Sequence, residues 1–295
     1  MATLYTHQDS NIRKTWLMMI VFLVVVGVLG YFLYWYFGNP IILVIAGAFA
    51  ILQVAGSYWF SDKIVLSMSG AKRASREAHF ELYNITENLA ITAGLPNPKL
   101  YIIDEQVPNA FATGRDPEHA VIAVTTGLLT TLNRTELEGV IAHEMSHIGN
   151  RDILIMTVAV MLVGFVMIVS DIAIRSAIFG GGRRNSRSDG KAGSAIAIIG
   201  FALLILSPIF AMVMNMSISR KREYLADASG ALLTRYPDGL ANALEKISAH
   251  GGKMKRANKS TAHLFISNPF GGSVKSIFAT HPPVEERIKR LRMFQ

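Results

Sequence analysis

The sequence predicts a mainly α-helical protein with a small β-sheet, joined to about four transmembrane helices. First, 51% of the 295 residues are hydrophobic and only 17% are charged, which is apolar for a soluble protein. Second, long uncharged runs alternate with stretches of ordinary soluble composition. Third, one soluble stretch contains His-Glu-Met-Ser-His, in which two histidines are spaced by one helical turn.

The first two apolar runs predict a transmembrane helical hairpin over residues 15–60. A polar segment, residues 1–14, precedes it. Trp16 to Tyr36 carries no charge, and as a helix it is about 31 Å long, enough to cross the hydrocarbon core. Ile41 to Phe60 is a second uncharged run after a Gly-Asn-Pro turn, and aromatic residues gather at the end of each run as in an interfacial belt.

Cations flank both ends of this hairpin, whereas its turn carries none. The positive-inside rule therefore places both ends in the cytoplasm. The flanking cations are Arg13, Lys14, Lys63, Lys72, Arg73 and Arg76.

Residues 61–152 predict the first half of a soluble domain. Apolar residues at helical spacing predict a helix over Glu77–Thr92. Three strands follow, and the second is interpreted as an edge strand. They are Leu100–Ile103, Asn109–Gly114 and His119–Val124.

A helix start signal precedes the histidine pair. Asn133 or Thr135 is the expected N-cap, and Glu136 or Glu138, three residues later, is its capping-box partner. The helix is expected to end at Gly149-Asn150.

Residues 153–218 contain two further apolar runs, Ile153–Ser170 and Ser194–Ser219, which are interpreted as membrane helices. An arginine- and glycine-rich loop separates them, and its five cations count against a position outside the cytoplasm. The alternative is a pair of long helices that lie partly within the soluble domain or at the membrane surface.

Residues 219–295 return to soluble composition and form the second half of the domain. Helices are expected there over Ser219–Thr234, Gly239–Ala249 and Val284–Phe294.

The spacing of His143 and His147 allows both imidazoles to bind one zinc ion from the same side of a helix, and Glu144 can reach a water on the metal. Because the chain has no cysteine, the third ligand is expected to be a carboxylate or a histidine. Glu223 is the best candidate. Asp227, one turn later, is expected to accept the distal N–H of a ligand histidine, although the reverse assignment stays open.

Peptide hydrolysis follows from this arrangement of charges. Glu144 takes a proton from water and passes it to the leaving amine. The oxyanion needs a donor beyond the metal, and His281, held rigid in Thr-His-Pro-Pro, is the candidate. A helix-capping or buried structural histidine is an equal alternative for His281.

These motifs together resemble the HtpX-type membrane zinc metalloproteases, a family related to the type I CAAX prenyl proteases. The likeness covers nearly the whole chain, from the hairpin to Thr280–Pro283. It implies a zincin-like protease domain with one zinc ion, in an endopeptidase that degrades damaged or misfolded membrane proteins. It also implies a multi-pass protein of the bacterial plasma (inner) membrane whose active site faces the cytoplasm.

The resemblance extends to individual residues. It implies that His143, His147 and Glu223 bind zinc and that Glu144 is catalytic. The stretch Asn109, Ala110 and Phe111 resembles the family's substrate-binding edge, to which an extended peptide adds as a strand.

A second class of function is a non-enzymatic membrane scaffold or chaperone-like factor with a structural metal. A structural zinc site has four protein ligands, whereas the sequence offers three good ones.

The net charge of +8 is expected to meet anionic lipid rather than nucleic acid, because the cations flank membrane runs and lack interleaved aromatic residues. The sequence makes no prediction of oligomeric state.

Overall fold

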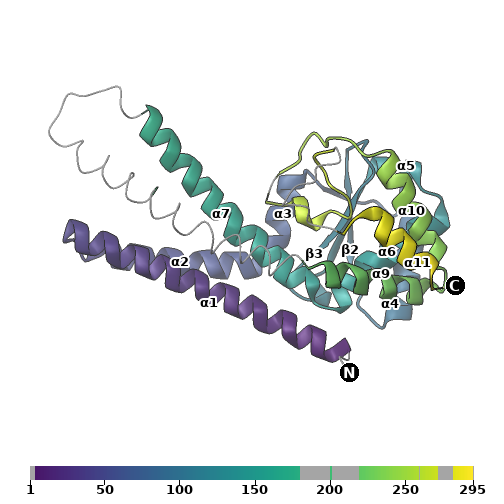
Figure 1. Cartoon of the computed structure of the whole chain (residues 1–295), viewed down its shortest axis with the longest axis horizontal. Coiled ribbons are helices and arrows are strands. Elements are labelled where there is room, and N and C mark those ends of the chain that lie inside the picture. The colour runs from purple at the N-terminus through teal and green to yellow at the C-terminus, as the bar shows by residue number, and fades with distance from the viewer. Residues whose placement is uncertain (1–3, 180–199, 201–218, 259, 272–281, 295) are drawn as a thin grey trace.

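The structure is a computed structural model of the chain and describes residues 4–179, 200, 219–258, 260–271 and 282–294. Figure 1 shows two parts, a domain built around a small sheet and an arm of long helices that projects from it. The arm consists of α1 (Leu4–Phe37), α2 (Ile41–Trp59) and the far end of α7 (Asp152–Phe179).

α1 and α2 form the predicted hairpin. Gly38 in the turn has a φ of 67°, which favours glycine, and the side-chain oxygen of Asn39 accepts a hydrogen bond of 3.0 Å from the Ile41 amide. The two helices approach closely at Gly30, where an added Cβ would lie 2.7 Å from the Cβ of Ala46. α1 begins at Leu4, so the polar residues before the apolar run are helical as well.

The prediction of about four transmembrane helices is not confirmed. Among the described residues, α1 and α2 are the two helices that are long and apolar enough to cross a membrane. A pair bent by 81°, α6 (Arg134–Gly149) and the first part of α7, would count as a third if it were one span. The run Ser194–Ser219 falls almost entirely outside the described residues.

The first turns of α7 belong to the domain. Ile155 and Val158 are fully buried, and they pack in a cluster with apolar side chains of the sheet and of α1. The apolar run that begins at Ile153 therefore supplies protein core before it leaves the domain. For this first run, the structure agrees with the alternative in which the helix lies partly within the soluble domain.

The sheet has four strands, and its order is β1 (Lys72–Arg73), β2 (Lys99–Ile103), β4 (Val121–Thr125) and β3 (Ala110–Thr113). β2 and β4 are parallel, and the other neighbours are antiparallel. The three predicted strands are thus present, and β3 lies at an edge as expected. The sequence does not predict β1, because two cationic residues have no alternating pattern. It also does not predict the short helices α3 (Ser61–Ser69) and α5 (Thr126–Thr131).

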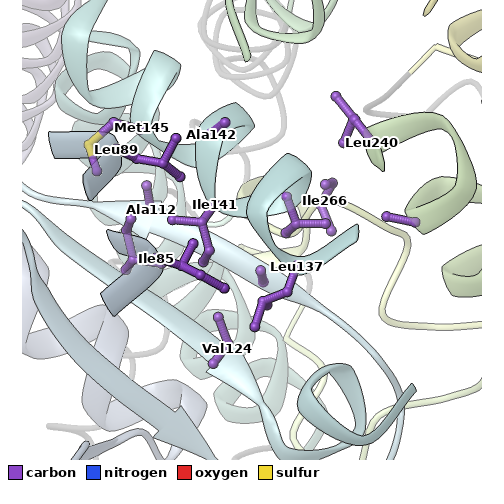
Figure 2. Close-up of a cluster of buried hydrophobic side chains, with 14 of the residues drawn as sticks. Ile85, Leu89, Ala112, Val124, Leu137, Ile141, Ala142, Met145, Leu240 and Ile266 are labelled. Carbon is purple, nitrogen blue, oxygen red and sulfur yellow. The ribbon is translucent and has the colours of Figure 1, made fainter. Parts of the chain in front are cut away.

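Apolar side chains alternate between the two faces of the sheet and build a core on each. One face holds Ile122 and Val124 against α6, α4 (Phe80–Ala93) and α10 (Pro237–Ala249), as Figure 2 shows in part. The other face holds Phe111 and Ala123 in one cluster with α7 and with Met18 of α1. The first membrane-type helix therefore contributes to the core of the soluble domain.

Candidate metal centre

The helix α6 that carries the histidine pair is fixed at its start by a capping box. Asn133 accepts a hydrogen bond from the Glu136 amide at 3.0 Å, and Glu136 accepts one from the Asn133 amide at 2.9 Å. The structure therefore selects Asn133 and Glu136 from the predicted alternatives. Apolar side chains of α6, among them Leu137, Ile141 and Met145, pack against the sheet and α4 (Figure 2).

His143 and His147 project from α6 into one buried point. Their Nε2 atoms lie 3.2 Å apart, and the two side chains are 1% and 7% exposed. Glu223 reaches the same point from α9 (Arg220–Thr234). Its carboxylate oxygens lie 3.9 Å from Nε2 of His143 and 3.6 Å from Nε2 of His147.

The close approach of α9 to α6 depends on Gly230. A Cβ added there would lie 3.0 Å from the backbone nitrogen of His143 and 3.2 Å from its Cα. A larger residue would push α9 away from the histidines. The glycine thus allows Glu223, two turns earlier on α9, to meet both imidazoles.

The three donors fit a zinc ion. Ligand atoms in a tetrahedral zinc site with bonds of roughly 2.0–2.1 Å lie about 3.4 Å apart, close to the distances between these donors. Two imidazoles and a carboxylate form a ligand set of catalytic zinc sites, which keep a fourth position for water. In the described part of the chain, the group able to hold a metal contains these three residues.

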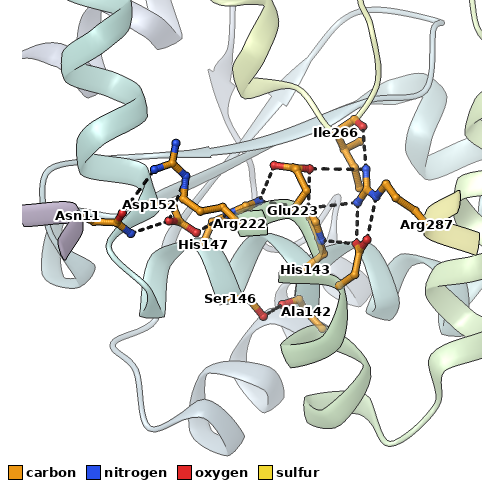
Figure 3. A network of polar contacts seen from close by, with 11 residues as sticks. Asn11, Ala142, His143, Ser146, His147, Asp152, Arg222, Glu223, Ile266 and Arg287 are labelled. Atoms are coloured by element: carbon orange, nitrogen blue, oxygen red, sulfur yellow. Dashed lines mark hydrogen bonds and ion pairs between the residues drawn. The ribbon is translucent and has the colours of Figure 1, made fainter. Parts of the chain in front are cut away.

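A carboxylate stands behind each histidine (Figure 3). Nδ1 of His147 lies 2.9 Å from Oδ2 of Asp152, within a hydrogen bond. Nδ1 of His143 lies 3.0 Å from Oδ1 of Asp227, close but not aligned as a hydrogen bond. Asp227 was predicted behind a ligand histidine, whereas Asp152 was not. The available signal was an acidic residue just beyond the end of the metal helix.

Arg287, which the sequence did not predict as a site residue, is fully buried in α11 (Val284–Arg292). It donates two hydrogen bonds to Asp227, from Nε at 2.9 Å and from Nη2 at 2.7 Å. Nη1 lies 3.7 Å from the Glu223 carboxylate. The signal for it was an arginine on the same helical face as Val284 and Leu291, which is the apolar face of an otherwise charged helix.

Burial and these partners set the charges of the site. Burial alone would raise the pKa of Asp227, but the charge of Arg287 and the contact with His143 outweigh it and lower the pKa to about 2. Burial lowers the pKa of His143. Burial also opposes the charged form of His147, but the hydrogen bond to Asp152 and the charge of Glu223 outweigh it and raise the pKa to about 9.

Glu144 is 2% exposed and lies beside the ligands on α6. Burial raises its pKa to about 7, and the backbone amide of Ala112 in β3 opposes that shift. A group with this pKa exchanges protons readily near neutral pH. His281 lies outside the described residues.

The sequence matches Peptidase family M48 over residues 77–295, a range that includes all of these side chains. The chain belongs to the M48 family. It is 49% identical over 292 residues to a "Protease HtpX homolog" of Caldanaerobacter subterraneus subsp. tengcongensis, covering 98% of this chain and 97% of that protein. It is 48% identical over 292 residues to a protein of the same name from Thermoanaerobacter pseudethanolicus, with the same coverage.

The M48 assignment agrees with the site. The protein is a membrane metalloprotease with zinc as its metal, as the sequence predicted. The fold is also similar to the crystal structure of S. mikatae Ste24p, with a TM-score of 0.53 and 20% sequence identity. That likeness covers 97% of this chain and 67% of the other and concerns the fold alone.

The pKa of His147 predicts proton release when zinc binds. Since this pKa is raised to about 9, the metal-free protein carries the proton at neutral pH, and the metal has to replace it. Addition of zinc at about pH 7 is expected to release about one proton per ion from His147. A pH indicator in weakly buffered solution measures the release. Zinc binding without proton release would contradict the expected charge of this histidine.

Proposed function

We propose that this M48 metalloprotease is an integral membrane endopeptidase in which His143, His147 and Glu223 hold zinc and Glu144 moves the proton. One observation carries the proposal, namely that the two Nε2 atoms and the Glu223 carboxylate converge in a buried site beside Glu144. Asp227 is the weaker candidate for the third ligand. It contacts Nδ1 of His143, whereas Nε2 of the same ring faces His147.

The chemistry divides between the metal and the side chains. Zinc bound in this site lowers the pKa of a water molecule and polarises the substrate carbonyl. Glu144 accepts a proton from the attacking water and donates it to the leaving amine as the peptide bond breaks. The hydrogen bond to Asp152 directs Nε2 of His147 at the ligand point, and Asp227 lies 3.0 Å from Nδ1 on the opposite side of the His143 ring. His281 stays the proposed donor to the oxyanion.

A scaffold or chaperone-like factor with a structural metal is the alternative. That function requires a closed site, in which a fourth protein ligand occupies the position of the water. The group of metal-binding residues in the described part of the chain has three members. Membership of a peptidase family also favours the enzyme.

Substrate is proposed to bind along β3, at Asn109, Ala110 and Phe111. Phe111 is fully buried and packs edge-on against Phe265, so its side chain is not available to a peptide, and pairing would use the backbone of this edge. The outward carbonyl of Ala110 accepts a hydrogen bond of 2.9 Å from the Ile266 amide. The Asn109 side chain forms two hydrogen bonds with Ser267, the residue after Ile266. Its Nδ2 donates to the Ser267 carbonyl at 2.9 Å, and its Oδ1 accepts from the Ser267 backbone amide at 3.2 Å. An incoming strand would replace this segment of the chain.

A strand edge that binds a peptide through backbone hydrogen bonds selects for an extended conformation rather than for particular side chains. Extended, unfolded segments are what damaged or misfolded membrane proteins offer, and their removal is the proposed role. The exposed apolar side chains of α1 and α2 support a bilayer position for residues 15–60, among them Val24, Val28, Ile45 and Leu52. The flanking cations favour a bacterial plasma membrane protein whose protease domain, residues 61–152 and 219–295, faces the cytoplasm.

Replacement of Glu144 separates metal binding from catalysis. The Glu144→Gln variant is expected to retain zinc, because the three ligands are untouched, and to lose about 10²–10⁴-fold in cleavage rate. Zinc content and hydrolysis of a membrane protein substrate are measured on the same purified sample. Glu138→Gln, on the same helix, serves as the matched control. Wild-type turnover by Glu144→Gln would refute the assigned role.

Strand addition at β3 predicts an alternating effect of peptide N-methylation. Methylation of the amide that pairs with the Ala110 carbonyl removes one hydrogen bond and is expected to weaken an inhibitory peptide about 5-fold. The adjacent amide points away from β3, because successive residues of a strand alternate. Its methylation is the control. Equal inhibition constants for the two methylated peptides would argue against strand pairing.

The proposed orientation is testable because the chain has no cysteine. Single cysteines replace Asn39 in the hairpin turn and Asn88 in α4, which are both exposed. In intact spheroplasts, a membrane-impermeant maleimide is expected to label residue 39 alone, and after lysis both. Labelling of residue 88 in intact spheroplasts would reverse the orientation.

A further inference from the structure

The N-terminal end of α1 docks onto the C-terminal end of the metal helix α6. The side-chain amide of Gln8 donates a hydrogen bond of 2.6 Å to the Gly149 carbonyl, and that of Asn11 donates one of 3.0 Å to the Asn150 carbonyl. The last carbonyls of a helix lack partners within the helix, so these bonds complete the end of α6. The polar N-terminal segment therefore contacts the domain at Gln8 and Asn11.

Asn11 extends this contact to the metal site. Its Nδ2 lies 2.7 Å from Oδ1 of Asp152, and Oδ2 of the same carboxylate lies 2.9 Å from Nδ1 of His147. Asn11 is 4% exposed and Asp152 is fully buried. Figure 3 shows the resulting chain of contacts from α1 through Asp152 to the imidazole.

The side-chain oxygen of Asn11 faces the guanidinium of Arg222. Oδ1 of Asn11 lies 3.4 Å from Nη1 of Arg222, whose Nε lies 3.7 Å from the Asp152 carboxylate. Arg222 directly precedes the candidate ligand Glu223. An amide donates through nitrogen and accepts through oxygen, so one neutral side chain satisfies a carboxylate and a guanidinium together. Aspartate would repel Asp152, and leucine of similar size would serve neither partner.

We infer that Asn11 is a positioning residue of the metal centre, through which the first membrane helix fixes the Asp152 carboxylate and hence the His147 ring. A buried carboxylate that loses a hydrogen-bond donor rotates or shifts towards its remaining partners. The imidazole bonded to it then loses its fixed direction. The inference rests on the proposed function in one respect, that His147 is a metal ligand.

The variants distinguish positioning from simple docking. Asn11→Leu removes both halves of the amide. Asn11→Asp replaces the donor with a second carboxylate that repels Asp152, while keeping the size of the side chain and the acceptor for Arg222. Gln8→Leu is the matched control, because it removes the docking bond to Gly149 one turn away without touching Asp152. His147→Ala is the reference for loss of a ligand.

The test uses the full-length protein in lipid nanodiscs. Zinc affinity is measured by competition with a chelator, and the direction of the ligands is read from the visible absorption spectrum of the cobalt-loaded protein. Both Asn11 variants are expected to lower zinc affinity about 3- to 10-fold and to alter the cobalt spectrum. The loss is smaller than the roughly 10–100-fold cost of removing a direct partner of a metal ligand, because Asn11 acts through Asp152. Gln8→Leu is expected to keep both, and His147→Ala to lose specific zinc binding.

Folded Asn11 variants with wild-type affinity and spectrum would overturn the inference, as would a Gln8→Leu variant that changes both equally. Asn11→Asp retains the size of the side chain and decides the matter if Asn11→Leu fails to fold. Retention of zinc by His147→Ala would instead overturn the proposed ligand set. Failure of the site and failure of the Asn11 inference are thus separate results.

Discussion

The buried ion pair between Arg287 and Asp227 is the interaction on which the arrangement of the site depends. A guanidinium without solvent requires anions, and Arg287 finds Asp227 at 2.7 Å and Glu223 at 3.7 Å. Such a pair adds little net stability, but loss of one partner leaves an uncompensated buried charge at a cost of about 3–5 kcal/mol. The terminal helix α11 is therefore held against α9, and α9 in turn presents Glu223 to the histidines.

The same rule operates on both imidazoles. His143 is backed by Asp227 and then by Arg287, and His147 is backed by Asp152 and then by Asn11 with Arg222. Each outward step supplies the opposite charge or a hydrogen bond to the group before it, which is how buried polar groups remain tolerable. Since these groups come from α1, α6, α7, α9 and α11, the metal geometry depends on the packing of the whole domain.

The sequence predicted those parts of the candidate site whose arrangement depends on residues close together along the chain. Helical spacing singled out His143, Glu144 and His147 as candidates, and the capping rule located the start of α6. The absence of cysteine restricted the third ligand to a carboxylate or a histidine, with Glu223 as the best candidate. Asn11 and Arg287 could not be predicted in this way, because their partners are distant along the chain and their roles arise from packing. The apolar run of α7 was ambiguous for a related reason. Lipid and protein core both bury apolar side chains, and periodicity does not distinguish between them.

The position of the site relative to the membrane follows from where two helices begin. α7 starts at Asp152, which contacts His147, and α1 passes Asn150 and Asp152 before it enters its apolar run. Both helices therefore lead away from the C-terminal end of the metal helix. If residues 15–60 cross the bilayer as proposed, a shift of α1 within the membrane acts directly on the Asp152 carboxylate. A fragment without α1 would keep the three candidate ligands but lack the hydrogen bond from Asn11 to the Asp152 carboxylate.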